Sequence, residues 1–502
     1  MTTAPASADR LPLRTKLAFG VGSAAEIIAL FSVSSYALLF YNQVLGVSAA
    51  WVGLAISASF VLDALIEPIV GSWSDRTSNS KWGRRHPWMF AAPIPIAISF
   101  YAIFNPPDGL SPLALAIWCA LSVSCMRWAM SAYHTPHLAL GAELSPHYTE
   151  RSKVMAYNSF FSWAGGSSMS YIALTFFFPK TEEFHNGLLN PAPWPAFAGT
   201  MAVAVVAILL VSAWFTRDRI PFLPKPAADT PKFSPVEFFK DMGKALTNVN
   251  YVWLLVGYFF LSMMIGLREG LRLYVYGFYW QISSSDLRWF IIGSFAGYAT
   301  AFIFAARMHG KFDKKLTIIW SGLAYAVIPA IPIVLGQFGV LRANTPGLLP
   351  ILITFAALAY GALSILSISV MSALADVADE NELKHGVRQE GILYSTRALA
   401  AKLDQAMGTA IAGAVITFIA FPEKAKPGSV PSDVLFNLAL WDGALAAVPG
   451  VIAAVCYGRY RINKASYEAT RTALAARRRE PQAGPDTVAT PAAGAAAATP
   501  AE

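Results

Sequence analysis

The sequence predicts an all-α membrane protein with twelve transmembrane helices arranged as two halves of six helices. Three observations support this fold class. Of the 502 residues, 55% are hydrophobic and only 14% are charged, whereas a soluble domain carries about 25% charged residues. Twelve stretches are each apolar over roughly the 20 residues that a helix needs to cross a bilayer, and mean hydropathy is +0.48. A long polar segment divides these stretches into two sets of six.

The twelve predicted helices follow one another along the chain with mostly short gaps between them. Several contain Gly and Pro, as at Pro93 and Pro95, which membrane helices tolerate. The expected ranges are 16–40, 48–74, 88–105, 112–142, 153–179, 194–216, 250–280, 285–306, 316–339, 348–375, 391–421 and 434–458.

Lys and Arg gather in alternate gaps: before the first apolar stretch and after the second, fourth, sixth, eighth and twelfth. By the positive-inside rule these gaps are cytoplasmic. We therefore expect a protein of the plasma membrane (the inner membrane, in a bacterium) with both termini in the cytoplasm. The net charge of +8 is spread over these gaps and forms no single patch, which argues against nucleic acid as a partner.

Four parts of the chain are predicted. Residues 1–216 form an N-terminal six-helix half, 217–249 a polar cytoplasmic loop, 250–460 a C-terminal six-helix half, and 461–502 a cytoplasmic tail expected to be disordered. Two halves with weak mutual similarity are typical of secondary transporters, which bind substrate between the halves. No phosphate-binding loop or hydrolase pattern occurs, so we expect no enzyme, and a gradient as the energy source.

The predicted second helix carries two acids, Asp63 and Glu67, which lie four residues apart and therefore on one face. Ionisable residues inside the membrane are costly and are functional candidates by default. The two carboxylates would coordinate a cation such as sodium, or hold a proton, because two like charges this close favour protonation of one of them. Lys402 on the eleventh helix is the predicted counter-charge. The alternative is a purely structural set of salt bridges.

Charged and aromatic residues on four other predicted helices are candidates for substrate binding. Arg127, Ser131 and His134 share one face of the fourth helix, and His134 is also a candidate for the cation site. On the seventh helix, pairing of Glu269 with Arg272 is the alternative to substrate contact. The predicted substrate-binding set is Glu26, Arg127, His134, Arg268, Arg272, Tyr276 and Arg397.

Four charged residues follow the second predicted helix on its cytoplasmic side: Asp75, Arg76, Arg84 and Arg85. We predict that they pair across the two halves and hold the cytoplasmic side closed. The alternative is a role in positive-inside topology alone, which needs only net positive charge.

Several motifs together resemble one transporter family. They are Lys16-Leu17-Ala18-Phe19-Gly20, Asp63-Ala64-Leu65-Ile66-Glu67-Pro68, Lys81-Trp82-Gly83-Arg84-Arg85-His86-Pro87-Trp88, and Asp376-Val377-Ala378-Asp379 through Arg388, Tyr394-Ser395 and Lys402. To about residue 460 the chain resembles the glycoside–pentoside–hexuronide:cation symporters (melibiose permease-like) of the major facilitator superfamily. The resemblance implies the major facilitator fold, alternating access, and symport of a sugar, glycoside or uronide with a proton or sodium. It also implies cation-binding roles for Asp63 and Glu67, a matching lysine at Lys402, and a contribution from Ser131.

The chain departs from the family at residues that bear on ion and substrate. His134 and Glu67 stand where the permease has aspartates, which favours a proton over sodium. Leu138, Ser159 and Arg397 replace sugar-recognition residues, so sugar is implied by the family alone. The alternative is an amphipathic or anionic solute, such as a lysophospholipid, whose head group contacts Arg397 and His134. We expect no cofactor, only a small solute and the bilayer as partners, and a monomer.

Overall fold

The computed structural model describes residues 11–77, 81–145, 147–223, 234–385, 390–462 and 464–479. All secondary structure in these ranges is helical. The first group of helices runs from the N-terminus to residue 216: α1 (Leu13–Leu39), η1 (Phe40–Val44), α2 (Ala49–Arg76), α3 (His86–Ala91), α4 (Pro93–Phe104), α5 (Pro112–Glu143), α6 (Tyr148–Ile172), η2 (Ala173–Phe177), η3 (Gly187–Leu189) and α7 (Trp194–Thr216).

A connecting segment and a second group of helices follow. The connecting segment holds η4 (Arg217–Phe222) and α8 (Pro235–Ala245). The second group comprises α9 (Val249–Tyr274), η5 (Val275–Tyr279), α10 (Ser284–Leu287), α11 (Phe290–Lys311), α12 (Lys314–Val327), α13 (Ala330–Gln337), α14 (Leu348–His385), α15 (Glu390–Phe418), α16 (Ser432–Leu440), η6 (Trp441–Leu445) and α17 (Ala446–Gly458), and α18 (Lys464–Arg479) ends the described chain.

Local sequence explains where several helices begin and break. The side chains of Ser111, Asn248 and Asp313 accept backbone N–H bonds at the starts of α5, α9 and α12, as N-cap residues do. Helices α3 and α4 meet at Pro93, and α12 and α13 are separated at Pro329. Proline interrupts a helix because it lacks the N–H that bonds the preceding turn.

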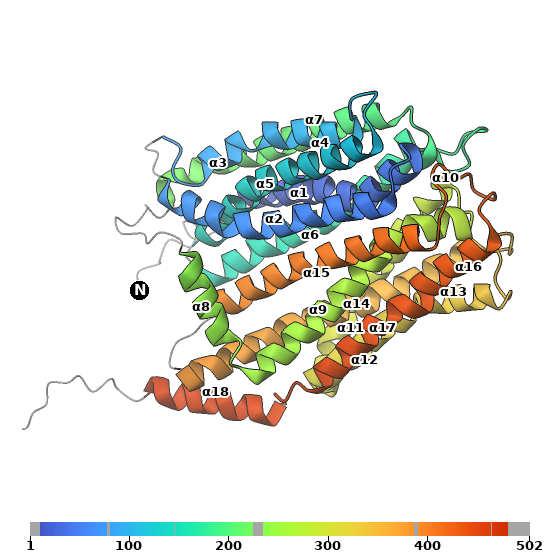
Figure 1. The fold of residues 1–502 in the computed structure, drawn as a ribbon. Helices are drawn as coiled ribbons and strands as arrows, with labels where there is room; N and C mark the ends of the chain where they lie inside the picture. The colour runs from blue at the N-terminus through green and yellow to red at the C-terminus, as the bar shows by residue number, and fades with distance from the viewer. Residues whose placement is uncertain are drawn as a thin grey trace, which may run out of the picture.

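The helices pack as two groups that meet along α15. Helix α1 packs on α6 and α7, and α2 packs on α5, whereas α9 packs on α17 and α11 on α14 (Figure 1). Helix α15 packs on both α2 and α9. Glycine permits this close contact: a Cβ added at Gly408 of α15 would lie 2.6 Å from the Cα of Gly266 in α9. Small residues bring membrane helices close together in this way.

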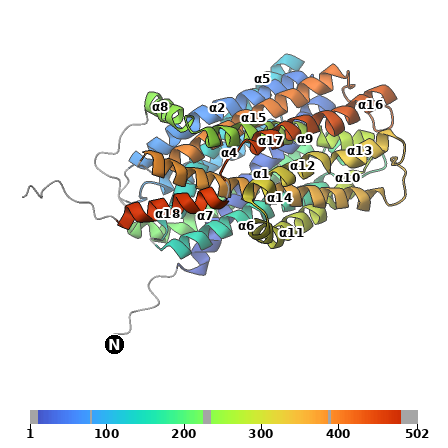
Figure 2. The ribbon, with the colours of Figure 1, turned by 90° about the horizontal axis from the view of Figure 1, so that it is seen from below.

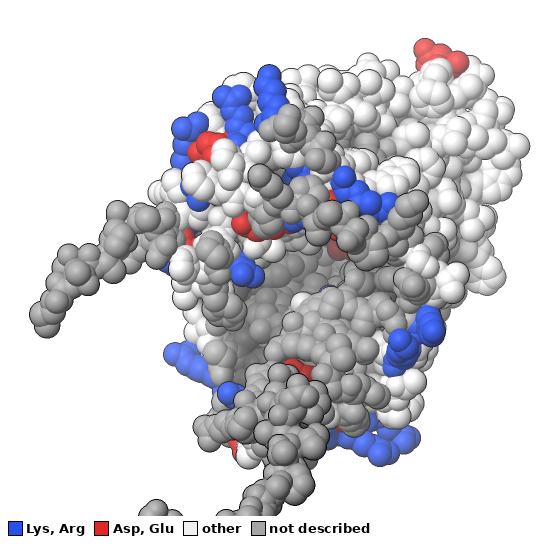
Figure 3. All heavy atoms as spheres, turned by 90° about the vertical axis from the view of Figure 1, so that its left-hand side faces the viewer, with Lys and Arg blue, Asp and Glu red and all other residues white. Residues whose placement is uncertain are grey.

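The two ends of the bundle differ. At the end away from the start of α1, here called the far end, hydrogen bonds join the two groups. Tyr274 donates to Asn42 (2.8 Å) and Gln43 donates to the carbonyl of Pro422 (3.0 Å). At the opposite, near end, Lys and Arg side chains lie around a hollow in the surface (Figure 3). The bundle is thus joined at the far end and hollowed at the near end.

Nine helical segments within the described ranges are long and apolar enough to cross a membrane. They are Leu13–Val44, Ala49–Arg76, His86–Phe104, Pro112–Glu143, Trp194–Phe222, Val249–Tyr279, Lys314–Gln337, Leu348–Leu383 and Ser432–Gly458. The other three expected spans coincide with α6, α11 and α15, which are helices of similar length but are not among these nine. Helix α15 carries the charges of Arg397, Lys402 and Asp404.

Two segments expected to lack regular structure contain helices. The central segment, expected as a loop over 217–249, holds η4 and the amphipathic helix α8. The tail, expected to be disordered from residue 461, forms α18 as far as Arg479. The expectation of disorder is therefore wrong for this part, where Ala, Glu and Arg favour a helix. Both α8 and α18 lie at the near end (Figure 1 and Figure 2); residues 480–502 lie outside the described ranges.

Candidate functional site

An ion-pair cluster joins the two groups of helices through Lys402. Its ammonium lies 2.8 Å from the Asp63 carboxylate and 2.7 Å from the Glu67 carboxylate. Asp63 is buried, whereas Glu67 and Lys402 are partly exposed. The acids come from α2 and the lysine from α15, so the predicted partnership spans the interface between the groups.

Helix α5 completes the surroundings of Asp63. The Ser131 hydroxyl donates to one carboxylate oxygen at 2.6 Å, and Arg127 lies 3.7 Å from the other. The Arg127 guanidinium also lies over the ring of Phe60, 3.5 Å from its centroid. Arg127, predicted to contact substrate, thus belongs to the ion-pair cluster. Two acids and two bases balance in charge, and the Lys402 ammonium bonds both of the acids that were predicted to coordinate a cation such as sodium or to hold a proton.

A second buried cluster, the Glu26 triad, consists of Glu26, His134 and His137. Each histidine places Nδ1 against one oxygen of the Glu26 carboxylate, at 2.7 Å for His134 and 2.8 Å for His137. His137 also bonds the carbonyl of Phe19 through Nε2, at 2.9 Å. Glu26 and His137 are buried, whereas 40% of the His134 side chain is exposed. The structure therefore brings together the predicted residues Glu26 and His134.

A cavity of about 240 Å³ lies between the two groups. It is lined by α1, α6, α9, α11 and α14, with Arg272 and Tyr276 among the lining residues. Arg272 donates to Glu269 at 3.1 Å and to Ser35 of α1 at 3.2 Å. Arg272 therefore both pairs with Glu269 and lines the cavity, although the sequence presented pairing and substrate contact as alternatives. The lining includes further polar and aromatic side chains: Ser162, Trp163, Ser167, Ser170, Arg288, Ser294, Tyr298 and Tyr360.

Two arginines predicted to bind substrate lie elsewhere. Arg268 donates to the carbonyls of Tyr325 (3.0 Å) and Ala326 (2.7 Å) near the end of α12, so it satisfies carbonyls that the helix leaves unpaired. It borders a smaller cavity of about 100 Å³ inside the second group. Arg397 lies over the ring of Tyr258, 4.4 Å from its centroid, and lines neither cavity.

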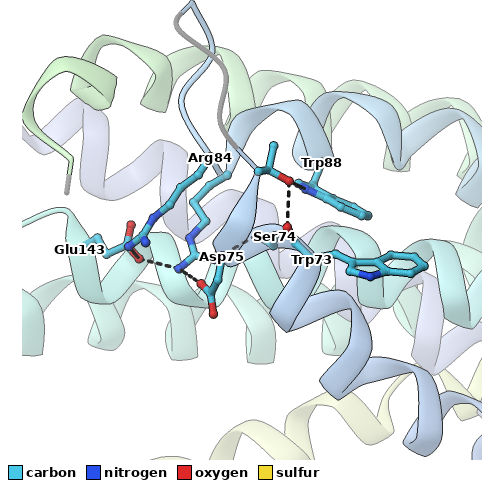
Figure 4. A network of polar contacts seen from close by, with 8 residues as sticks. Trp73, Ser74, Asp75, Arg84, Trp88 and Glu143 are labelled. Carbon is cyan, nitrogen blue, oxygen red and sulfur yellow. Dashed lines mark hydrogen bonds and ion pairs between the residues drawn. The ribbon is translucent and has the colours of Figure 1, made fainter. Parts of the chain in front are cut away.

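The predicted gate charges form a network at the near end of the first group. Arg84 and Arg85 each donate to the same Glu143 carboxylate oxygen at 2.7 Å, and Arg85 lies 2.6 Å from Asp75 (Figure 4). Arg76 bonds Ser72 within α2. In this conformation, which is open at the near end, the four charges bond within the first group. Their pairing across the halves, which would hold this end closed, stays a prediction.

Glu143→Gln is expected to destabilise this network, because it leaves the buried Arg85 guanidinium with one fewer counter-charge. Loss of one member of a buried ion pair costs about 3 kcal/mol or more. We expect a lower Tm for the purified protein and a slower initial transport rate. Glu182→Gln, which changes an exposed acid at the far end, serves as the control. An unchanged Tm for Glu143→Gln would contradict the stabilising role of the network.

Comparisons with known proteins identify the family. Residues 18–464 match the model of the family described as MFS/sugar transport protein. The chain belongs to this family. It is therefore an integral membrane transporter and not an enzyme, and its resemblance to the glycoside–pentoside–hexuronide:cation symporters is confirmed.

Curated relatives and solved structures agree with this assignment. The isoprimeverose transporter of Lactiplantibacillus pentosus is 25% identical over 83% of this chain and 83% of its own. The putative glycoside/cation symporter YagG of Escherichia coli (strain K12) is 24% identical over 95% and 98% of the two chains. The crystal structure of a D-xylose-proton symporter aligns over 90% of this chain and 97% of its own with a TM-score of 0.56 at 14% identity. The last likeness shows the major facilitator fold alone.

Sequence reasoning missed three residues in the site of this MFS transporter. His137 lies three residues after His134 and shares its helix face, a signal that could have found it. Glu143 carries no such signal, because its arginine partners lie in another segment. Asp404 had no predicted role. Its side chain is fully buried, and neither carboxylate oxygen has a hydrogen-bond partner of normal geometry among the described residues, although Ser262 lies close enough to act on it.

Asp404→Asn is expected to raise the Tm of the purified transporter. A carboxyl group buried without a partner is costly in either form, because the charge is uncompensated when the group is ionised and protonation has to be driven when it is neutral. The amide of similar size avoids both costs. Lys402→Met is the contrasting variant on the same helix, since it leaves Asp63 and Glu67 without their shared counter-charge and should lower the Tm. A fall in Tm for Asp404→Asn as large as that for Lys402→Met would show that the Asp404 charge is stabilising.

Proposed function

We propose that this protein is a secondary active transporter that couples the symport of a sugar, glycoside or uronide to a cation, a proton or sodium, by alternating access. The observation that carries the proposal is Lys402 bonding Asp63 and Glu67 across the two groups of helices. Charges in the membrane interior are costly, and here they are placed where the two groups must move relative to each other. The named relatives, an isoprimeverose transporter and a putative glycoside/cation symporter, support the choice of solute.

The ion pairs suggest how cation binding would act on the interface. A cation bound at Asp63 or Glu67, or a positive charge close enough to draw one of these acids away from Lys402, weakens the contact between α2 and α15. A ligand shifts a conformational equilibrium only by as much as its affinities for the two states differ. Cation binding therefore favours whichever state separates Lys402 from the acids.

The cavity between the groups is the proposed solute site. Tyr276, Tyr298, Tyr360 and Trp163 offer aromatic faces for a sugar ring, and the hydroxyls and guanidinium offer hydrogen bonds. Two arginines, Arg272 and Arg288, line the cavity, which favours a sugar that bears a carboxylate. The lysophospholipid alternative finds less support, because Arg397 lies outside the cavity.

The membrane arrangement is part of the same proposal. We assign twelve transmembrane helices in two six-helix halves to a plasma membrane, with α6, α11 and α15 as the spans beyond the nine apolar segments. The near end, where Lys and Arg gather (Figure 3), is assigned to the cytoplasm together with both termini. With the far end joined, the described conformation is then inward-facing. We expect the transporter to act as a monomer.

Solute-dependent thermal stabilisation of the purified protein tests this proposal. A solute that binds only the folded protein raises Tm with the logarithm of one plus the ratio of its concentration to Kd. The panel is isoprimeverose, D-xylose, lactose, glucuronate and a lysophosphatidylcholine above and below its micellar concentration. We expect stabilisation by a glycoside or the uronate, and we expect Arg272→Gln to shift this stabilisation to higher solute concentrations. Stabilisation by the lysolipid alone would contradict the sugar assignment and favour the amphipathic solute.

A further inference from the structure

The Glu26 triad has a hydrogen-bond pattern that fixes where protons must lie. The carbonyl of Phe19 can only accept, so Nε2 of His137 must carry a proton. Nδ1 of the same ring bonds Glu26. Either both ring nitrogens are protonated and Glu26 is ionised, or Glu26 is protonated and donates to Nδ1. In both arrangements one proton is shared between Glu26 and His137.

Packing holds His137 in this position. Its ring lies 4.3 Å from that of Phe19 and 5.3 Å from that of Tyr133, measured between centroids. A Cβ added at Gly22 would lie 2.9 Å from Nε2 and 2.6 Å from the Ser212 hydroxyl, so α1 approaches the ring closely only because residue 22 is glycine. His137 is therefore a fixed, buried partner of Glu26 rather than a mobile side chain.

His134 is the more exposed of the two histidines in the triad. It uses Nδ1 to bond Glu26, which leaves Nε2 as its other ring nitrogen, and 40% of its side chain is exposed. When Glu26 is ionised, Nδ1 of His134 donates to it. A proton can then form an N–H bond at Nε2. Because His137 already balances the charge of Glu26 in this arrangement, the loaded triad carries a net charge of +1.

The charges around the triad link it to the ion-pair cluster. Glu26 faces the two histidines and the neutral Tyr133 of α5, and α7 contributes the neutral Ser212. His134 also interacts electrostatically with Glu67 of α2 and Lys402 of α15. A positive charge on His134 attracts Glu67 and repels Lys402, and so competes with the Lys402–Glu67 ion pair that spans the interface.

We infer that the coupling ion is a proton, and that the Glu26 triad is its binding site, with His134 as the residue that loads and releases it. The inference rests on the proposed symport function. Imidazole nitrogens are proton acceptors at neutral pH, whereas sodium, a hard cation, prefers oxygen ligands. The proton adds to Nε2 of His134 from water on one side, weakens the Lys402–Glu67 contact, and leaves from Nε2 to water on the other side.

The triad can be tested without a known solute. In the purified protein labelled with ¹⁵N-histidine, in lipid nanodiscs at neutral pH, we expect a strongly deshielded ring N–H proton from the Glu26–His137 bond. Glu26→Gln and His137→Asn should each abolish this signal, and His185→Asn, which changes an exposed histidine at the far end, should leave it. A spectrum that Glu26→Gln does not change would overturn the proton-sharing triad.

Transport by proteoliposomes tests the role of the triad in coupling. With labelled isoprimeverose or D-xylose in sodium-free buffer, a pH gradient should drive accumulation by the wild type. His134→Asn should reduce that accumulation at least tenfold and retain solute exchange at equal concentrations. Accumulation that requires sodium, or that persists in His134→Asn, would overturn the inference and leave symport intact. If the wild type exchanged none of the solutes in the panel, the result would instead count against the proposed function. The nanodisc spectra would still test whether Glu26 and His137 share a proton.

Discussion

Asp63→Asn is expected to abolish accumulation of solute against its gradient. The substitution removes the charge that pairs with Lys402 at 2.8 Å across the interface, while the amide oxygen can still accept from Ser131. Loss of the charge takes away the difference between the cation-bound and cation-free states on which coupling depends. The accumulation ratio in proteoliposomes should fall to one, whereas exchange of solute at equal concentrations should continue.

Asp433→Asn is the matched control for this variant, because Asp433 is an exposed acid at the start of α16. Its accumulation ratio should equal that of the wild type. The amount of Asp63→Asn protein that is inserted and purified as a single folded species should also be normal. Full accumulation by Asp63→Asn would remove Asp63 from the coupling site.

Arg272→Gln is expected to weaken solute binding by roughly 30-fold. Arg272 lines the cavity and reaches from α9 to Ser35 of α1, so it joins both groups at the proposed solute site. A hydrogen bond to a charged group contributes about 2 kcal/mol, and each 1.4 kcal/mol corresponds to about a factor of ten in affinity. The apparent Kd from the thermal-stabilisation series measures this effect.

Arg397→Gln is the control for Arg272→Gln. It removes the same charge from a position on Tyr258 outside the cavity lining, and we expect a change in Kd of less than about twofold. Equal losses of affinity in the two variants would show that the effect is a general response to a removed charge. A loss of affinity for Arg397→Gln alone would show that the solute head group contacts Arg397 on α15. This outcome would favour the amphipathic or anionic solute.

The sequence was sufficient to predict the helices and the centre of the ion-pair cluster. An apolar stretch long enough to span the bilayer has few alternatives to a helix, because backbone polar groups in a bilayer must form hydrogen bonds within the protein. Asp63 and Glu67 could be paired because residues four apart share a face of one helix. Lys402 could be matched to them by depth in the membrane alone, since few other cations lie in the apolar part of the second half.

Partners that depend on helix packing could not be predicted. Glu26 and His134 are 108 residues apart in the chain, and only the packing of α1 on α5 shows that they meet. Arg85 could have paired with an acid of either half, and its bond to Glu143 follows from the position where α5 ends. Arg268 has the charge expected of a substrate ligand. The break at Pro329, however, leaves carbonyls of α12 without helical partners, and the Arg268 guanidinium donates its hydrogen bonds to them.

The measurement that most directly tests the central claim is ion movement caused by solute. Proteoliposomes with no initial gradient receive the panel solute that stabilises the protein most, and entry of protons and of labelled sodium is recorded alongside entry of the solute. We expect cation entry in fixed proportion to solute entry, in the wild type and not in Asp63→Asn. Entry of solute without any cation would show a facilitator and would contradict cation-coupled symport.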